Sequence, residues 1–159
     1  MFSHARNAQW KKLLTDRGIL QAVIGTITAP PLPKTAWKSG WRTIGGKRKY
    51  YRSKWEANYA RYLELLKSKS QLKEWEHEPE TFWFKEIKRG CVSYLPDFRI
   101  TEMNGKISYH EVKGHMDQKS QTKLKRMHKY YPKVTIRIID KEWFRNNKRM
   151  LAQIIPDWE

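Results

Sequence analysis

The sequence predicts a single mixed α/β domain preceded by a basic N-terminal extension. A chain of 159 residues fits one domain of ordinary size. From residue 53 onward, segments with helical periodicity alternate with segments rich in β-branched and aromatic residues, in the order α-β-β-β-α-β-α. Hydrophobic residues make up 39% of the chain, and 8 Trp, 8 Tyr and 5 Phe supply large apolar side chains. This composition is sufficient for a packed core and excludes a disordered basic tail.

The charge of the chain indicates a polyanionic partner. Lys and Arg number 33 against 16 Asp and Glu, which gives a net charge of +17. Such an excess is typical of proteins that bind nucleic acid. An anionic membrane surface would also attract it, but no strongly amphipathic basic helix favours that alternative. The single cysteine, Cys91, excludes an internal disulfide and a multi-thiolate zinc site.

Charge is unevenly distributed along the chain and suggests its organisation. Residues 1–54 contain 12 basic and 1 acidic residue, residues 55–113 contain 10 of each, and residues 114–159 contain 11 basic and 5 acidic residues. We expect residues 1–50 to form the basic extension, with a helix at 5–17, a Pro/Gly-rich segment at 25–33, and contacts to DNA or to a second subunit. Residues 51–159 form the α/β domain. No apolar run approaches the roughly 18 residues of a membrane span, and no signal peptide is recognisable, so a cytoplasmic protein is expected.

The clearest helix begins after Ser53 and ends near Ser68. Ser53 and Glu56 have the spacing of a capping box. The apolar residues of this segment fall on one helical stripe: Trp55, Tyr59, Tyr62, Leu63 and Leu66.

The remaining elements follow from periodicity and turn signals. We expect two strand pieces within 72–86, a hairpin formed by 93–101 and 106–113, a helix at 117–130, a strand at 134–139 and a helix at 141–154. Trp75, Trp83 and Trp143 are assigned to the core. Residues 34–52 mix cations with aromatic residues, which fits either phosphate binding with base stacking or a strand whose aromatic residues enter the core.

The register of the central hairpin decides which side chains share a face. A two-residue turn at Asn104-Gly105 would place Asp97 opposite Val112 and send Glu111 to the other side. A three-residue loop at 103–105 places Asp97 opposite Glu111, with Lys113 further along the same face. Such loops favour glycine at their last, left-handed position, and Gly105 stands there. We therefore expect the second register.

In that register the hairpin carries two carboxylates about 5 Å apart at their Cβ atoms. Their repulsion is relieved by a proton or a cation, and hard carboxylate oxygens suit Mg²⁺, with Mn²⁺ as a substitute. A metal held by Asp97 and Glu111 could activate water for phosphodiester hydrolysis. Lys113 could then orient the water or neutralise developing charge, and Glu56 could supply a third oxygen.

Simpler roles remain open for the same residues. Glu56 is fully explained as a helix cap, Asp97 could merely begin a strand, and Lys113 could be a surface lysine. His110 and His115 have a spacing that zinc could use, although no partner ligand is evident.

Two short motifs make the sequence recognisable. The stretch at 94–98, Tyr-Leu-Pro-Asp-Phe, followed by Glu-Val-Lys-Gly at 111–114, resembles the PD-(D/E)XK nuclease signature. Over about 90 residues the order of motifs further resembles the phage endonuclease I family of Holliday-junction resolvases. Archaeal-type resolvases and the nuclease subunit of some transposases share this order. Residues 1–50 do not match the endonuclease I pattern, which leaves the mode of dimerisation open.

The resemblance implies a restriction-endonuclease-like fold, with a mixed central sheet flanked by helices, and Mg²⁺-dependent cutting of DNA. It implies catalytic roles for Glu56, Asp97, Glu111 and Lys113. The expected metal ligands are Asp97, Glu111, the backbone carbonyl of Val112, and Glu56 either directly or through water. It also implies a homodimer, because a four-way junction needs two symmetric cuts, and allows a phage-encoded protein in a bacterial host.

We therefore expect an endodeoxyribonuclease that acts as a Holliday junction resolvase on four-way or branched DNA. The alternatives are a duplex endonuclease of the same fold in recombination, repair or transposition, and a non-catalytic nucleic-acid-binding protein. The expected DNA contacts are the cations Lys47, Arg48, Lys49, Arg52, Lys119, Lys123 and Arg126.

Overall fold

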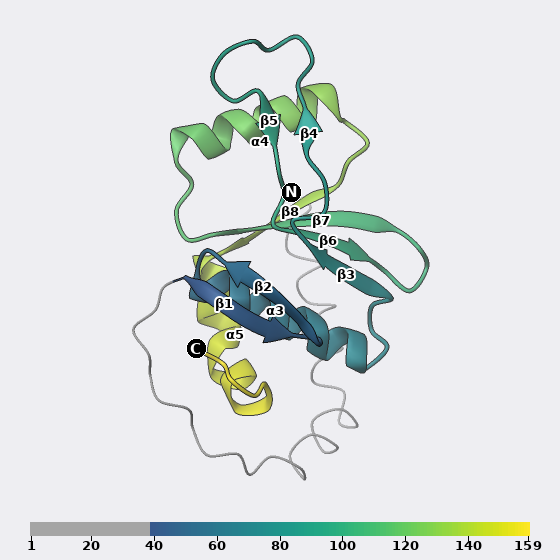
Figure 1. The fold of residues 1–159 in the computed structure, drawn as a ribbon, viewed down its shortest axis with the longest axis vertical. Helices are drawn as coiled ribbons and strands as arrows, with labels where there is room; N and C mark the ends of the chain where they lie inside the picture. Colours follow the sequence, from purple (N-terminus) through teal and green to yellow (C-terminus); the bar gives the residue numbers. More distant parts are fainter. Residues whose placement is uncertain (1–38) are drawn as a thin grey trace.

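The computed structural model describes residues 39–159 and arranges them in three layers. A four-stranded sheet forms the middle layer (Figure 1). A helix and a short two-stranded ribbon cover one face, while two helices and a β-hairpin lie on the other. The predicted helix at 5–17 and the Pro/Gly-rich segment at 25–33 lie outside the described residues. Within the described part, no helix is long and apolar enough to cross a membrane.

The central sheet is mixed, with strand order β3-β6-β7-β8. Three strands run antiparallel, and the fourth is parallel to β7 and is reached through a crossover helix, α4. This confirms the mixed α/β class and the mixed sheet. The bounds are β3 (Glu74–His77), β6 (Phe98–Thr101), β7 (Ile107–Lys113), α4 (Gln118–Tyr130) and β8 (Ile136–Asp140).

The predicted register of the central hairpin is confirmed. Phe98 lies opposite His110, and the N–H of Glu102 donates to the carbonyl of Lys106 at 2.8 Å. The loop between them has three residues, and Gly105 adopts a left-handed φ of +82° at its end. One residue further along, the same register places Asp97 opposite Glu111. Directly opposed residues project from the same face of the sheet, so these two side chains are neighbours.

The predicted strand at 93–101 is divided into two. β5 (Ser93–Tyr94) pairs with β4 (Phe82–Trp83) in a separate ribbon, and β6 begins only at Phe98. Pro96 lies at the break and has no N–H to donate to a ladder. The carbonyl of Asp97 accepts the N–H of Glu78 at 2.8 Å instead, so the chain changes sheet immediately before the predicted acid.

Helix α3 (Lys54–Ser68) lies where the sequence predicts it. The Ser53 side chain caps it by accepting the N–H of Glu56 at 3.1 Å. Its apolar stripe packs against the sheet and against α5 (Lys141–Ile154) to form the larger core. The Trp55 ring stacks on Phe144, with centroids 4.5 Å apart.

The β-hairpin of β1 (Gly40–Ile44) and β2 (Lys47–Tyr51) covers part of α3. Its turn is Gly45-Gly46, with φ of +59° and +75°, as a tight two-residue turn requires. Ile44 and Tyr51 point inward and are buried, whereas other aromatic residues of the hairpin point outward. The interpretation of this segment as a strand whose aromatic residues enter the core is confirmed for Tyr51, and binding of phosphates and bases stays a prediction; residues 34–38 lie outside the described residues.

A smaller core lies under α4 on the opposite face of the sheet. Phe84, Tyr94 and Met127 are almost fully buried there. The assignment of Trp83 to the core is wrong, because its side chain is 60% exposed. β4 has only two residues, and alternation turns Phe82 inward against Tyr109 and leaves Trp83 outward.

Replacing Gly105 tests the loop that fixes the hairpin register. We expect Gly105→Ala to lower the free energy of unfolding by about 1 kcal/mol, because a β-carbon is unfavourable at left-handed φ. Urea denaturation measures it. Gly40→Ala is the matched control, since the added Cβ would make only an ordinary contact, 3.5 Å from the Arg42 guanidinium. Equal stability of the two variants would contradict the assigned loop geometry.

Candidate functional site

The site is built around two acids that the β6–β7 register brings together. The Asp97 carboxylate accepts the N–H of Val112 through Oδ2 at 2.8 Å, which fixes it against the neighbouring strand. Glu111 is 7% exposed, and its Oε2 accepts the hydroxyl proton of Tyr94 at 2.9 Å. Lys113 Nζ lies 3.2 Å from Glu111 Oε1. The predicted acid–acid–lysine group is thus spatially contiguous.

Burial and the nearby charge of Glu111 disfavour the ionised form of Asp97. Desolvation, and then the charge of Glu111, raise the pKa of Asp97 well above its ordinary value. The hydrogen bond from Val112 and the charge of Lys113 oppose that rise without cancelling it. The pair therefore favours a proton or a cation in the space between its oxygens. All-oxygen donors of this kind fit Mg²⁺ or Mn²⁺, so the donor set agrees with the predicted metal.

A close approach between β7 and α3 brings the helix acid near this pair. A β-carbon on Gly114 would lie 3.3 Å from Trp55 Cζ3, so the chain after Lys113 runs tightly against the first turn of α3. Glu56 projects from that same turn, and its charge contributes to the raised pKa of Asp97. Among the elements of the fold, the end of β7, the start of β6 and the start of α3 thus converge at the site.

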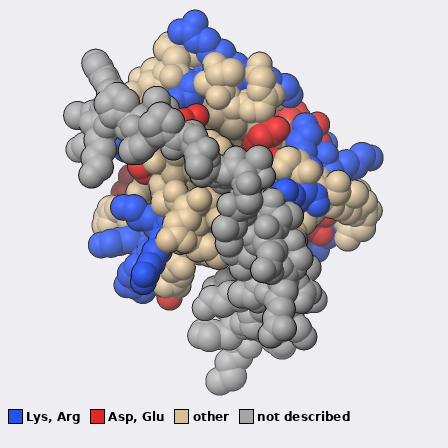
Figure 2. Space-filling view, turned by 90° about the horizontal axis from the view of Figure 1, so that it is seen from below, with Lys and Arg blue, Asp and Glu red and all other residues tan. Residues whose placement is uncertain are grey.

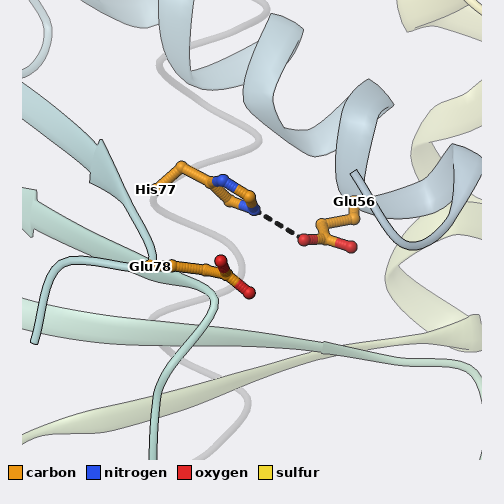
Figure 3. A group of neighbouring side chains, drawn as sticks. All are labelled: Glu56, His77 and Glu78. Carbon is orange, nitrogen blue, oxygen red and sulfur yellow. Dashed lines mark hydrogen bonds and ion pairs between the residues drawn. The ribbon is translucent and has the colours of Figure 1, made fainter. Parts of the chain in front are cut away.

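Glu56 is itself held by partners that sequence analysis did not identify. It is 4% exposed, and its Oε2 accepts the backbone N–H of Arg52 at 2.8 Å. Its Oε1 lies 2.6 Å from His77 Nε2 (Figure 3). One ligand atom from each of Glu56, His77 and Glu78 lies within 4.8 Å of the others, so these three residues could hold a metal ion. Trp75 and His77 are two residues apart on one strand, so their side chains lie on the same face of the sheet. A buried Trp75 therefore predicts that His77 also faces α3.

Glu78 is held in an unusual position at the end of β3. Its φ is +48°, in a region that non-glycine residues seldom adopt, and its N–H donates to the Asp97 carbonyl. Its carboxylate forms an ion pair with the Arg52 side chain. Arg52 therefore contacts two members of the Glu56–His77–Glu78 group, one through its backbone and one through its guanidinium.

The cations expected to contact DNA have different environments. On β2, Lys47, Arg48 and Lys49 are exposed. On α4, Lys119 is exposed and Lys123 is half-buried, while Arg126 donates to the Cys91 carbonyl and so holds the loop before β5. Figure 2 shows Lys and Arg side chains gathered at several places around the face that it presents.

The two histidines with zinc-like spacing are not part of the group that could hold a metal. His110 faces α3, where its Nδ1 lies 2.7 Å from the Tyr59 hydroxyl. Burial lowers the pKa of His110 to about 3, so it remains neutral. His115 is exposed in the segment before α4.

Comparison with known proteins places the chain in a family. A family described as "Protein of unknown function (DUF1064)" matches residues 38–145. The chain belongs to the DUF1064 family. The match includes Glu56, Asp97, Glu111 and Lys113 and excludes most of α5. No curated protein and no solved structure matches this DUF1064 chain.

Neutralising Asp97 should stabilise the metal-free protein at alkaline pH. The folded-state pKa of Asp97 is raised, so its contribution to stability is full below the unfolded pKa and is lost as pH rises through the folded value. Each pKa unit corresponds to about 1.4 kcal/mol, which is roughly 3–5 °C in Tm for a chain of this size. We expect Asp97→Asn to melt higher than the wild type in EDTA near pH 9 and to match it near pH 3, where Asp97 is protonated in both the folded and the unfolded state.

Asp117 provides a control of opposite sign for this measurement. The hydrogen bond from the Ser120 N–H lowers the pKa of Asp117, so Asp117→Asn should not gain stability as pH rises. If Asp97→Asn and Asp117→Asn had parallel pH profiles, the raised pKa of Asp97 would be refuted.

The Glu56–His77–Glu78 group should be distinguishable from the Asp97–Glu111 pair by metal preference. Imidazole is a better ligand for Mn²⁺ than for Mg²⁺. We expect Glu78→Gln to weaken Mn²⁺ binding, measured by calorimetry, by about 10-fold or more, and to leave Mg²⁺ binding unchanged. Asp97→Asn should weaken Mg²⁺ binding. If Glu78→Gln changed neither affinity, the group would serve only as an ion-pair network.

Proposed function

We propose that this protein is a Mg²⁺-dependent DNA endonuclease that uses Asp97, Glu111 and Lys113, with four-way or branched DNA as its preferred substrate and a homodimer as its working form. The observation that carries the proposal is the pairing of the buried carboxylate of Glu111 with the half-buried carboxylate of Asp97, whose pKa is strongly raised, beside Lys113 on the strand of Glu111. A structural role does not require two acids to be desolvated within reach of each other, because such desolvation lowers stability.

The metal would be held by Asp97 and Glu111, with the Val112 carbonyl and Glu56 as further predicted ligands. When bound there, Mg²⁺ would polarise the scissile phosphate and lower the pKa of a water molecule. Lys113 would orient that water and neutralise charge on the phosphate in the transition state. The structure shows its ammonium group paired with Glu111 Oε1 at 3.2 Å.

Tyr94 acts as a positioning residue for Glu111. Burial, and then the charge of Glu111, raise the pKa of Tyr94 far above its ordinary value, so its hydroxyl remains a proton donor. The hydrogen bond to Oε2 leaves Oε1 on the side of Lys113. Arg52 and His77 restrain Glu56 in the same manner.

A hollow next to Lys113 offers a place for an approaching phosphate backbone. Its volume is about 460 Å³. Its lining includes the cations Lys113, Lys141 and Arg145 and the acids Asp140 and Glu142, so its cations exceed its acids by one. The net charge of +17 favours polyanion binding in general. The preference for branched DNA and the dimer rest on the resemblance to phage junction resolvases.

Removing either central acid should abolish cleavage while preserving DNA binding. We expect Asp97→Ala and Glu111→Ala to cut a labelled four-way junction in Mg²⁺ about 100-fold more slowly or worse than the wild type. Junction affinity, measured by gel shift in Ca²⁺, should be equal or slightly higher, because removal of a negative charge favours a polyanion. Glu86→Ala, at an exposed acid outside the site, is the matched control and should cut normally.

The substrate panel separates the proposal from its alternatives. Paired symmetric cuts in the junction, faster than cuts in linear duplex of the same sequence, would support a dimeric resolvase. Equal rates on both substrates would keep the nuclease and remove the junction preference. Tight binding without cleavage in either Mg²⁺ or Mn²⁺ would reject the catalytic proposal.

A further inference from the structure

The outer face of the β1–β2 hairpin displays two large aromatic rings in water. Trp41 is 62% exposed and Tyr50 is 47% exposed. They are direct cross-strand partners, with ring centroids 5.8 Å apart and an interplanar angle of 74°. A single exposed aromatic residue is ordinary, whereas clustered exposed aromatic rings are typical of binding surfaces.

This aromatic pair is held rigidly before any ligand arrives. The Tyr50 hydroxyl donates to Ser39 Oγ at 3.1 Å, and the Arg48 guanidinium lies 5.3 Å from the Trp41 ring centroid. On the inner side, Ile44 and Tyr51 are buried against α3. A ligand that stacks on these rings therefore loses little affinity to ordering of the protein.

The aromatic pair lies next to the proposed catalytic site along the chain. Arg52 follows Tyr50 by two residues, so their Cα atoms are at most about 7 Å apart. The Arg52 N–H donates to Glu56, and its guanidinium pairs with Glu78. A nucleotide on the hairpin would therefore lie on the side of Glu56, the helix acid of the proposed site.

The charge of the hairpin indicates which class of ligand its outer face binds. Residues 39–52 contain no acid, and the cations Lys47, Arg48 and Lys49 on β2 are exposed. Cations interleaved with exposed aromatic rings match the backbone and the base faces of a single strand. In an intact duplex the base faces are stacked on one another, so a duplex would use the cations but not the rings.

We propose that the Trp41–Tyr50 pair and Arg48 bind an unpaired nucleotide of the substrate, with its base stacked on the aromatic rings and its phosphate held by the cations of β2. The inference rests on the proposed function for its choice of DNA as ligand. It narrows the proposed branched DNA to molecules that offer an unpaired base, such as a flap or a junction whose base pairs open at the branch point.

The test compares base-containing and abasic single strands on the full-length protein. Fluorescence anisotropy in Ca²⁺ would measure affinity for a labelled oligo-dT strand, for the same strand with abasic residues, and for a duplex of equal length. We expect Trp41→Ala to weaken binding of oligo-dT by about 5- to 150-fold and to leave duplex affinity unchanged. The wild type should bind the abasic strand more weakly than oligo-dT by a similar factor. Trp41→Ala should lose little further affinity when the bases are removed.

Two variants guard against trivial explanations. Trp83→Ala removes a tryptophan that is equally exposed, at 60%, but lies on β4, so it should leave oligo-dT binding unchanged. Trp41→Phe keeps an aromatic face and should retain most of the affinity. The proposal would be overturned if Trp41→Ala and Trp83→Ala lost equal oligo-dT affinity, or if the wild type bound the base-containing and abasic strands equally well. Metal-dependent cutting by the wild type, absent in Asp97→Ala, would still stand in that case, so the two proposals fail separately.

Discussion

The register between β6 and β7 is the constraint on which the site depends. Because side chains alternate along a strand, a shift of one residue would move Glu111 to the face of His110 and bury its charge among the aromatic rings of α3. A three-residue loop closed by one left-handed glycine prevents that shift. The hydrogen bond from the Val112 N–H to the Asp97 carboxylate fixes the register at the other end of the same pair of strands.

Neighbouring side chains offset the repulsion between the acids that this register brings together. Tyr94 and Lys113 bind Glu111, while Arg52 and His77 bind Glu56, so each carboxylate has defined partners. These partners come from both faces of the sheet and from the loop before α3. Each carboxylate is thus held in position by its partners.

Much of this arrangement could be predicted from local sequence patterns. The helix after Ser53, the hairpin register and the face shared by Asp97 and Glu111 follow from capping, loop length and alternation, which are local rules. Alternation along β3 could place His77 on the face of Trp75, but the proximity of His77 and Glu78 to Glu56 depends on how β3 packs against α3, which no local pattern specifies. The exposure of Trp83 could not be predicted, because a two-residue strand gives too little alternation to define a buried face.

The hydrogen bond from the Arg52 peptide to Glu56 has a thermodynamic consequence. This peptide directly follows β2, so any ligand that displaces the hairpin must alter the environment of a buried acid. Linkage makes such an effect reciprocal: the factor by which a nucleic acid changes cation affinity equals the factor by which the cation changes nucleic-acid affinity. If the hairpin binds nucleic acid and the acids bind a cation, as proposed above, this single backbone amide would couple the two binding events.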